Sequence, residues 1–201
     1  VTVLPYREHG KPKQVKGFLS QFKKMAKANN AYYATFAKQG TLIGLDPSMT
    51  LSFKDEYAKA LGHAPDFTVA LLQTFLARLS KASLSSLIPP PSNVILGLDP
   101  GIQSKLSSDV ARHKTRGPIQ KSYQLILHCT EESTVPHADT LWIEVFKKFG
   151  LALKVIHTGC CGMAGTYGHE IEHQATSKKL FDTHWKPHLD SKSEVLATGF
   201  S

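Results

Sequence analysis

The sequence predicts an α/β protein of two small parallel-sheet lobes that are joined by an irregular connector. Short apolar segments alternate with helical patterns over residues 1–80 and again over 123–201, which is typical of strand–helix–strand units. Between them, residues 81–122 contain Pro89-Pro90-Pro91 and closely spaced glycines, which interrupt regular elements. The length of 201 residues is sufficient for a buried core in this arrangement.

The first lobe, residues 1–80, is expected to alternate helices and strands. Phe18, Phe22 and Met25 lie at helical spacing on one face, and Gly40 is expected to end the helical region. The expected elements are a strand at 1–6, helices at 15–28 and 31–38, a strand at 41–45, a helix at 51–61, and a helix at 67–79 with Asp66 as its N-cap.

The connector is expected to carry one strand, at 94–98. This strand leads into Asp99 and resembles the opening strand of a ribonuclease-H-like nuclease, in which an aspartate at that position holds Mg²⁺. Such a site needs several carboxylates, and Asp109 is the one candidate that follows. The nuclease interpretation is therefore rejected.

The second lobe, residues 123–201, places all three cysteines of the chain at strand ends. The expected elements are a strand at 123–127, a helix that ends at Gly150, a strand at 151–156, a helix at 170–185 and a strand at 194–198. Cys129 follows the first of these strands, and Cys160-Cys161-Gly162 follows the second. Because ligands in parallel sheets bind at the carboxyl ends of strands, the three thiols are expected to converge.

The cysteine pattern favours metal binding over disulfides. An odd count with two adjacent cysteines is a poor disulfide framework, because a bridge between neighbours strains the peptide. Free thiols fit a reducing compartment, so a cytoplasmic location is expected. Thiolates are the usual ligands of iron–sulfur clusters, and Gly162 leaves room for a cluster to approach the backbone.

Three segments around these cysteines resemble a known family. They are 127–131, the stretch 159–170 that contains the Cys-Cys-Gly step, and 195–201. They resemble the CCG (heterodisulfide-reductase-like) cysteine-rich region at the C-terminus of FAD-linked D-2-hydroxyacid dehydrogenases of the D-2-hydroxyglutarate or D-lactate type. Segments 10–18 and 45–51 resemble the same proteins, so the two lobes are interpreted as CCG-type repeats.

The resemblance implies an electron-transfer module of a larger oxidoreductase. It implies that Cys129, Cys160 and Cys161 are ligands of a [4Fe–4S] cluster, with Gly162 beside it. In the family a further cysteine follows the position of Ser201, so the second lobe is expected to be truncated and the cluster incomplete. Met49 stands where the repeats often have a cysteine, so the first lobe is expected to be degenerate. FAD is expected in a domain outside this chain. The implied partners are flavin and ferredoxin-like domains of the same parent chain and an electron acceptor.

Two other classes of function remain as alternatives. The segment His169-Glu170-Ile171-Glu172-His173 matches the H-E-x-x-H pattern of zinc peptidases, in which a helix presents both histidines on one face. The formal charge of +8 comes mostly from lysine, which also fits a non-catalytic docking module. No aromatic-interleaved basic motif is present, so no nucleic-acid partner is expected. No apolar run is long enough for a membrane span, and the N-terminal residues do not form a signal peptide.

Overall fold

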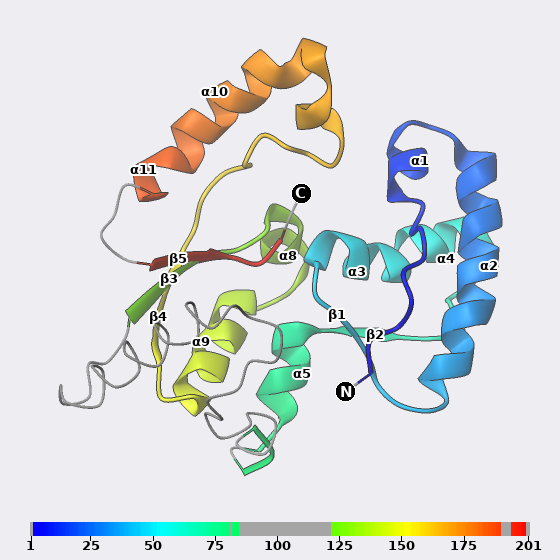
Figure 1. The fold of residues 1–201 in the computed structure, drawn as a ribbon, viewed down its shortest axis with the longest axis horizontal. Helices are drawn as coiled ribbons and strands as arrows, with labels where there is room; N and C mark the ends of the chain where they lie inside the picture. Colours follow the sequence, from blue (N-terminus) through cyan, green and yellow to red (C-terminus); the bar gives the residue numbers. More distant parts are fainter. Residues whose placement is uncertain (1, 81, 85–121, 190–193, 200–201) are drawn as a thin grey trace, which may run out of the picture.

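The computed structural model describes residues 2–80, 82–84, 122–189 and 194–199. Two small parallel sheets lie in separate halves of the molecule, each accompanied by helices (Figure 1). We call residues 2–80 the first half and residues 122–199 the second half. The predicted α/β class with two parallel sheets is confirmed. The strand expected at 94–98, with Asp99 and Asp109, lies outside the described residues.

The first half contains a two-stranded sheet in which β1 and β2 are parallel. Its Cα partners are Leu42 with Val69, Ile43 with Ala70, and Gly44 with Leu71. In chain order its elements are α1 (Lys11–Val15), α2 (Leu19–Ala37), β1 (Leu42–Gly44), α3 (Pro47–Lys54), α4 (Glu56–Leu61), β2 (Val69–Leu71) and α5 (Leu72–Arg78).

Several predicted elements of the first half are wrong in detail. Residues 2–6 form no strand, and the helices expected at 15–28 and 31–38 are the single helix α2. The helix expected at 67–79 begins with the strand β2, because residues 69–71 pair with β1. Asp66 does not cap a helix, since its carboxylate and backbone N–H both bond to the side chain of Asn30, at 2.7 and 2.8 Å.

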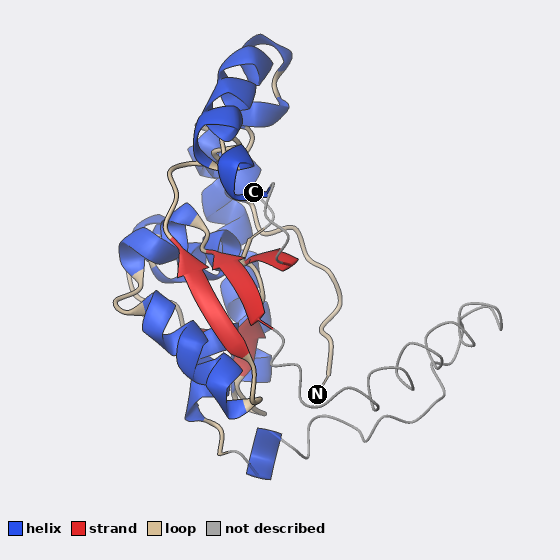
Figure 2. Ribbon diagram, turned by 90° about the vertical axis from the view of Figure 1, so that its left-hand side faces the viewer, coloured by secondary structure: helices blue, strands red, loops and turns tan. Residues whose placement is uncertain are grey.

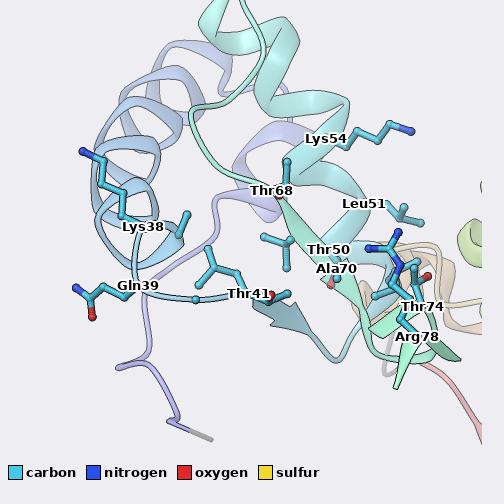
Figure 3. A pocket seen from close by; sticks show the side chains of 15 residues that line it. Lys38, Gln39, Thr41, Thr50, Leu51, Lys54, Thr68, Ala70, Thr74 and Arg78 are labelled. Atoms are coloured by element: carbon cyan, nitrogen blue, oxygen red, sulfur yellow. The ribbon is translucent and has the colours of Figure 1, made fainter. Parts of the chain in front are cut away.

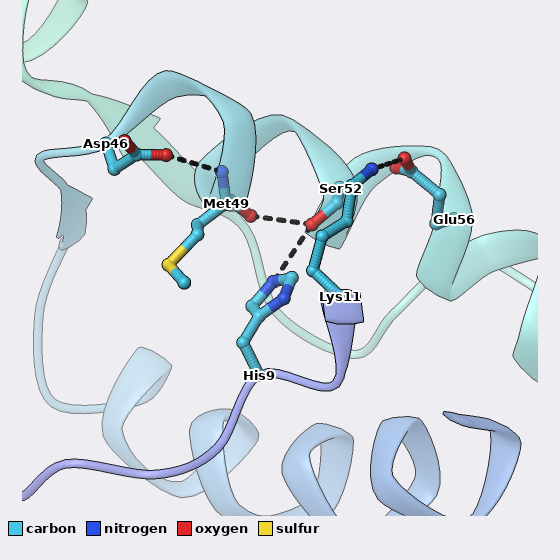
Figure 4. A network of polar contacts seen from close by, with 6 residues as sticks. All are labelled: His9, Lys11, Asp46, Met49, Ser52 and Glu56. Carbon is cyan, nitrogen blue, oxygen red and sulfur yellow. Dashed lines mark hydrogen bonds and ion pairs between the residues drawn. The ribbon is translucent and has the colours of Figure 1, made fainter. Parts of the chain in front are cut away.

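The core of the first half is aromatic, and it encloses a polar network that fixes α3 (Figure 4). His9 is 6% exposed and packs edge-on against Phe53, with ring centroids 4.5 Å apart. Its Nε2 lies 2.9 Å from Oγ of Ser52, which donates to the carbonyl of Met49. Asp46 caps α3 by accepting from the N–H of Met49 at 2.8 Å. The extended N-terminal segment is therefore attached to the helix that follows β1.

The second half contains a three-stranded parallel sheet in the order β4-β3-β5. Leu125 of the central strand pairs with Val155 on one side and with Leu196 on the other. The elements are β3 (Ser122–Ile126), α8 (Cys129–Thr134), α9 (Ala138–Lys148), β4 (Ala152–Ile156), the 3₁₀ turns η1 (Tyr167–His169) and η2 (Ile171–His173), α10 (Gln174–His184), α11 (Lys186–Leu189) and β5 (Glu194–Ala197). All three strands were predicted to within two residues.

The two halves contact each other through helices. Helix α5 packs against α9, and α3 packs against α8 between the two sheets (Figure 1). Lys148 of α9 donates to the carbonyl of Leu79 at 2.9 Å and also to that of Ala77. Figure 2 shows the strands of the second sheet side by side, with α10 beyond one end of them. Within the described ranges, no helix combines the length and apolar character that a membrane crossing requires.

Candidate cysteine site

The three cysteines lie at the carboxyl ends of two neighbouring strands. Cys129 is the first residue of α8, directly after β3, and its thiol is exposed. Cys160 and Cys161 are half-buried in the loop that follows β4, the strand paired with β3. None of the three forms a disulfide. The topology therefore places all three thiols at one edge of the sheet, as the sequence predicts.

The pKa of the Cys129 thiol is raised above its usual value. The first cause is partial desolvation of the sulfur, although the residue as a whole is exposed, and the second is the proximity of Cys160, with a smaller contribution from Cys161. A hydrogen bond involving Thr130 opposes this increase. An elevated pKa keeps an isolated thiol protonated, whereas metal binding requires the thiolate and releases the proton.

The Cys-Cys-Gly loop depends on Gly162. Its N–H donates to Sγ of Cys160 at 3.3 Å, and its φ of +91° lies in the left-handed region. A Cβ at this position would lie 2.3 Å from the carbonyl oxygen of Ser177 in α10. The backbone of the loop therefore approaches α10 more closely than any side chain at position 162 would permit.

The C-terminal end of α10 holds the other side of the loop. Trp185 Nε1 donates to the carbonyl of Gly159 at 3.2 Å, and Nδ1 of His184 lies 3.3 Å from the carbonyl oxygen of Cys160. A Cβ at Gly159 would lie 2.8 Å from the His184 ring, so this glycine is also required by packing. The helix that the sequence predicts after the cysteines thus acts as their support.

A pocket of about 500 Å³ lies beside Cys161. Its walls are mainly apolar and come from the loop, from α10 and from the end of β5. They include Met163, Phe181, Trp185 and Gly199. Such a volume is within the range of small-ligand and cofactor sites, and the apolar walls lower the local dielectric constant around the thiol.

The end of β5 closes the site next to Cys129. Thr198 Oγ1 accepts from the N–H of His128 at 2.9 Å and donates to Glu131 at 2.5 Å. A Cβ at Gly199 would lie 2.4 Å from the ring of His128. The backbone at Gly199, after β5, therefore packs directly against the side chain of His128, at the start of α8, and leaves no room for a side chain at position 199.

Glu131 is a functional candidate that the sequence analysis missed. Its side chain is completely buried and accepts hydrogen bonds from Gln73 Nε2 at 2.5 Å and from Trp142 Nε1 at 2.8 Å, in addition to Thr198. Burial raises its pKa, and the three hydrogen bonds oppose the increase. In the sequence Cys129-Thr130-Glu131-Glu132 nothing distinguishes Glu131 from the surface residue beside it.

The H-E-x-x-H segment does not form the helix that a zinc peptidase needs. His169 and His173 lie in separate 3₁₀ turns, and the helix expected from residue 170 begins only at Gln174. His173 instead stacks on Tyr167, with centroids 4.0 Å apart, and lies 3.6 Å from the carboxylate of Glu170. Glu170 is also 3.5 Å from Lys16. The segment thus connects the loop to α1 rather than presenting two imidazoles on one face.

Across the ranges that the structure describes, no group of three or more His, Cys, Asp or Glu side chains is arranged to hold a metal ion. This result argues against a preformed zinc site at His169 and His173. A cluster of several irons places its ligands further apart than a single ion does, so ligation by Cys129, Cys160 and Cys161 stays a prediction.

His157, which follows β4, contacts the carboxylate of Glu132 through its Nδ1, at 2.6 Å.

Fold and site together define an α/β protein with two small parallel sheets and three cysteines, none of them in a disulfide, at the strand ends of the second sheet. No protein-family model and no solved structure matches the chain. Among curated proteins, it is similar to the D-2-hydroxyglutarate dehydrogenases of Pseudomonas putida (36% identity over 202 residues), Haemophilus influenzae (35% over 204) and Escherichia coli (32% over 203).

These alignments cover 99% to 100% of this chain but only 17% to 18% of each relative. The chain therefore spans about a sixth of the length of the curated relatives that it matches. The activity that these names state is that of the relatives, which are much longer than the region that is similar.

Proposed function

We propose that this chain is the iron–sulfur electron-transfer module of an FAD-dependent D-2-hydroxyacid dehydrogenase. The observation that carries the proposal is the position of three cysteines, none of them in a disulfide, at the carboxyl ends of β3 and β4, which are adjacent and parallel. Similarity to D-2-hydroxyglutarate dehydrogenases over nearly the whole chain supports D-2-hydroxyglutarate as the substrate of the complete enzyme, with D-lactate as the alternative.

The donor set fits a [4Fe–4S] cluster. Cys129, Cys160 and Cys161 would supply three thiolates, and a fourth is expected from chain that continues past Ser201. When bound, the cluster supplies one-electron transfer between a two-electron flavin and an acceptor. Gly162 already donates its N–H to Sγ of Cys160, and this type of bond stabilises negative charge on sulfur.

The other residues of the site position the thiols. Trp185 and His184 hold the cysteine loop from one side, and Glu131 fixes α8 through Thr198 from the other. Met163 and Phe181 add apolar surface beside Cys161. A site held from both sides changes little in geometry between oxidation states, which favours rapid electron transfer.

The proposal includes the partners of the module. FAD would be bound by another domain of the same parent protein, and ferredoxin-like domains and an electron acceptor would exchange electrons with the cysteine site. Three cysteines without a disulfide support a reducing compartment such as the cytoplasm. We expect no salt-sensitive binding to nucleic acid, and such binding would instead favour a docking role for the lysine-rich surface.

Iron and acid-labile sulfide analysis tests the proposal. The 201-residue chain and an extended chain with the closing cysteine segment should be purified without oxygen and reconstituted in parallel. We expect the extended chain to retain iron and sulfide in equal amounts, and the 201-residue chain to retain much less. In the extended chain, Cys160→Ser and Cys161→Ser should each abolish the additional iron and sulfide.

The matched control is His169→Ala, which leaves every thiol in place and should not change the iron content. Iron retention that is unaffected by both serine variants would contradict the proposal. Oxidation of D-2-hydroxyglutarate should then be measured in the complete enzyme with the same variants. Reduction of the flavin should persist, while transfer of electrons to an external acceptor should be lost.

A further inference from the structure

The first half contains a second pocket, with a volume of about 750 Å³ (Figure 3). It lies over the small sheet of β1 and β2 and is bounded by the end of α2, by α3 and by α5. It shares no lining residue with the pocket beside Cys161. Ligand binding to this pocket can therefore be measured independently of what the cysteines bind.

The charged side chains around this pocket are all cationic. Lys38 lies on one side, and Lys54 and Arg78 lie on the other (Figure 3). No aspartate or glutamate is among the lining residues. Within the described part of the chain, none of these three cations forms an ion pair, although seven such pairs are present elsewhere. The positive charges come from three different helices or helix ends and lie around the rim of the pocket, where the amino groups of Lys38 and Lys54 extend to opposite sides (Figure 3).

Hydroxyl groups and an aliphatic floor complete the lining. Thr41, Thr68 and Thr74 line the pocket, and their hydroxyls have no side-chain hydrogen bond to another described residue. Thr50 differs, because its hydroxyl already donates to the carbonyl of Asp46 at 2.6 Å. Apolar side chains also line the pocket, among them Leu42, Val69 and Leu51. Donors around an apolar floor suit a ligand with an anionic head and an apolar body.

We propose that this pocket binds a small organic phosphate. A phosphate monoester carries close to two negative charges and three acceptor oxygens, which matches a site with several cations and several free hydroxyl donors. A guanidinium such as that of Arg78 binds phosphate oxygens through two parallel hydrogen bonds, and lysines contribute point charges. The aliphatic floor would contact the organic part, and the volume lies within the range for ligands of that size.

The probe for the test is adenosine 5′-monophosphate, with adenosine and inorganic phosphate as comparisons. Binding to the 201-residue chain should be followed by isothermal titration calorimetry and by amide chemical shifts. We expect the monophosphate to bind and to shift the resonances of Thr41, Thr68 and Thr74. Adenosine should bind at least about tenfold more weakly, because it lacks the charged head.

Arg78→Met and Lys54→Met should each weaken binding of the monophosphate by about tenfold, since each removes a charge-assisted hydrogen bond while keeping an apolar stem. Lys59→Met is the matched control, because Lys59 is an exposed lysine of α4 that does not line the pocket. All three sites are exposed, so the variants should fold normally. Equal binding of adenosine and its monophosphate, or equal effects of Lys59→Met and Arg78→Met, would overturn the proposal. Absence of binding by all three probes would overturn it as well.

Discussion

The side-chain amide of Gln73 donates a hydrogen bond of 2.5 Å to the carboxylate of Glu131, and this bond joins the two halves of the molecule. Gln73 belongs to α5 and is 1% exposed, and Glu131 lies two residues after Cys129. Because the same carboxylate oxygen accepts from Trp142 and the other oxygen accepts from Thr198, one buried group connects α5, α8, α9 and β5. The first half thereby contributes to the position of the cysteine helix.

Replacement of Glu131 should destabilise the chain more than replacement of any one of its partners. Glu131→Ala leaves the buried amide of Gln73 and the partly buried donors of Trp142 and Thr198 without this acceptor, so we expect the free energy of unfolding to fall by about 3 kcal/mol. Glu131→Gln keeps the shape and one acceptor oxygen and should cost clearly less. Urea unfolding of both variants, monitored by circular dichroism, measures the difference.

A double-mutant cycle with Gln73→Ala isolates the bond between the halves. We expect a coupling energy between positions 73 and 131 of about 1 to 2 kcal/mol, since the two side chains are in direct contact. The matched control pairs Glu131→Ala with Asn30→Ala, a buried residue that bonds to Asp66 instead. Equal coupling in the two cycles would contradict the assigned role of Gln73.

Gly162→Ala should damage the cysteine loop through packing and not only through backbone strain. Its Cβ would lie 2.3 Å from the Ser177 carbonyl, whereas a Cβ at Gly62, with φ +83°, would meet no atom within 4 Å. We therefore expect Gly62→Ala to cost about 1 kcal/mol for its left-handed backbone and Gly162→Ala to cost about 3 kcal/mol or more. Similar losses of unfolding free energy in the two variants would show that the contact with α10 is unimportant.

The stability of the first half should fall as the pH is lowered, because His9 is buried. Burial lowers the pKa of His9 from 6.5 to about 4, so the unfolded chain binds a proton in a range where the folded chain does not. The contribution of His9 is present at neutral pH and is lost as the pH falls from about 6.5 towards 4. We expect a loss of about 2 kcal/mol at pH 5 relative to pH 7.5.

The measurement is urea unfolding at a series of pH values for the chain and for His9→Gln. Glutamine can still bond to Ser52 but cannot take up a proton, so the variant should be less stable at neutral pH and less dependent on pH. His63→Gln, at an exposed histidine, should retain the full pH dependence. An unchanged slope in His9→Gln would show that another group is responsible.

The H-E-x-x-H segment should bind no zinc stoichiometrically. Its histidines lie in two separate turns, and His173 is stacked on Tyr167. We expect Glu170→Gln to leave any zinc content unchanged and to weaken the contacts of Glu170 with Lys16 and His173, each worth about 0.5 kcal/mol for such solvent-accessible pairs. Stoichiometric zinc that His173→Ala abolishes would revive the peptidase alternative.

The sequence predicted the second half better than the first for a physical reason. Strands β3, β4 and β5 are apolar runs bounded by turn residues, and this pattern is strong in a single sequence. Strand β2 is three residues long and runs directly into α5, so the apolar residues from Phe67 onward have the periodicity of one helix. Only the pairing with β1, a long-range contact, distinguishes the strand.

In the candidate site, too, some residues could be predicted from local sequence and others could not. The cysteines and Gly162 are identified by residue type and spacing, which local sequence contains. Glu131 and Gln73 are 58 residues apart in the chain, and their burial results from packing between the halves. No local pattern marks a carboxylate that tertiary structure removes from water.

The order β4-β3-β5 has a consequence for how the thiol site is assembled. The central strand, β3, is the first of the three in the chain, and its partner β5 comes about seventy residues later, at 194–197. During synthesis, Cys129, Cys160 and Cys161 emerge before the strand that completes the sheet and positions Thr198 against His128. Pairing over such a separation is slow, so the thiols pass through a period without their final support. Protection of these thiols from oxidation should therefore depend on the rate at which β5 docks.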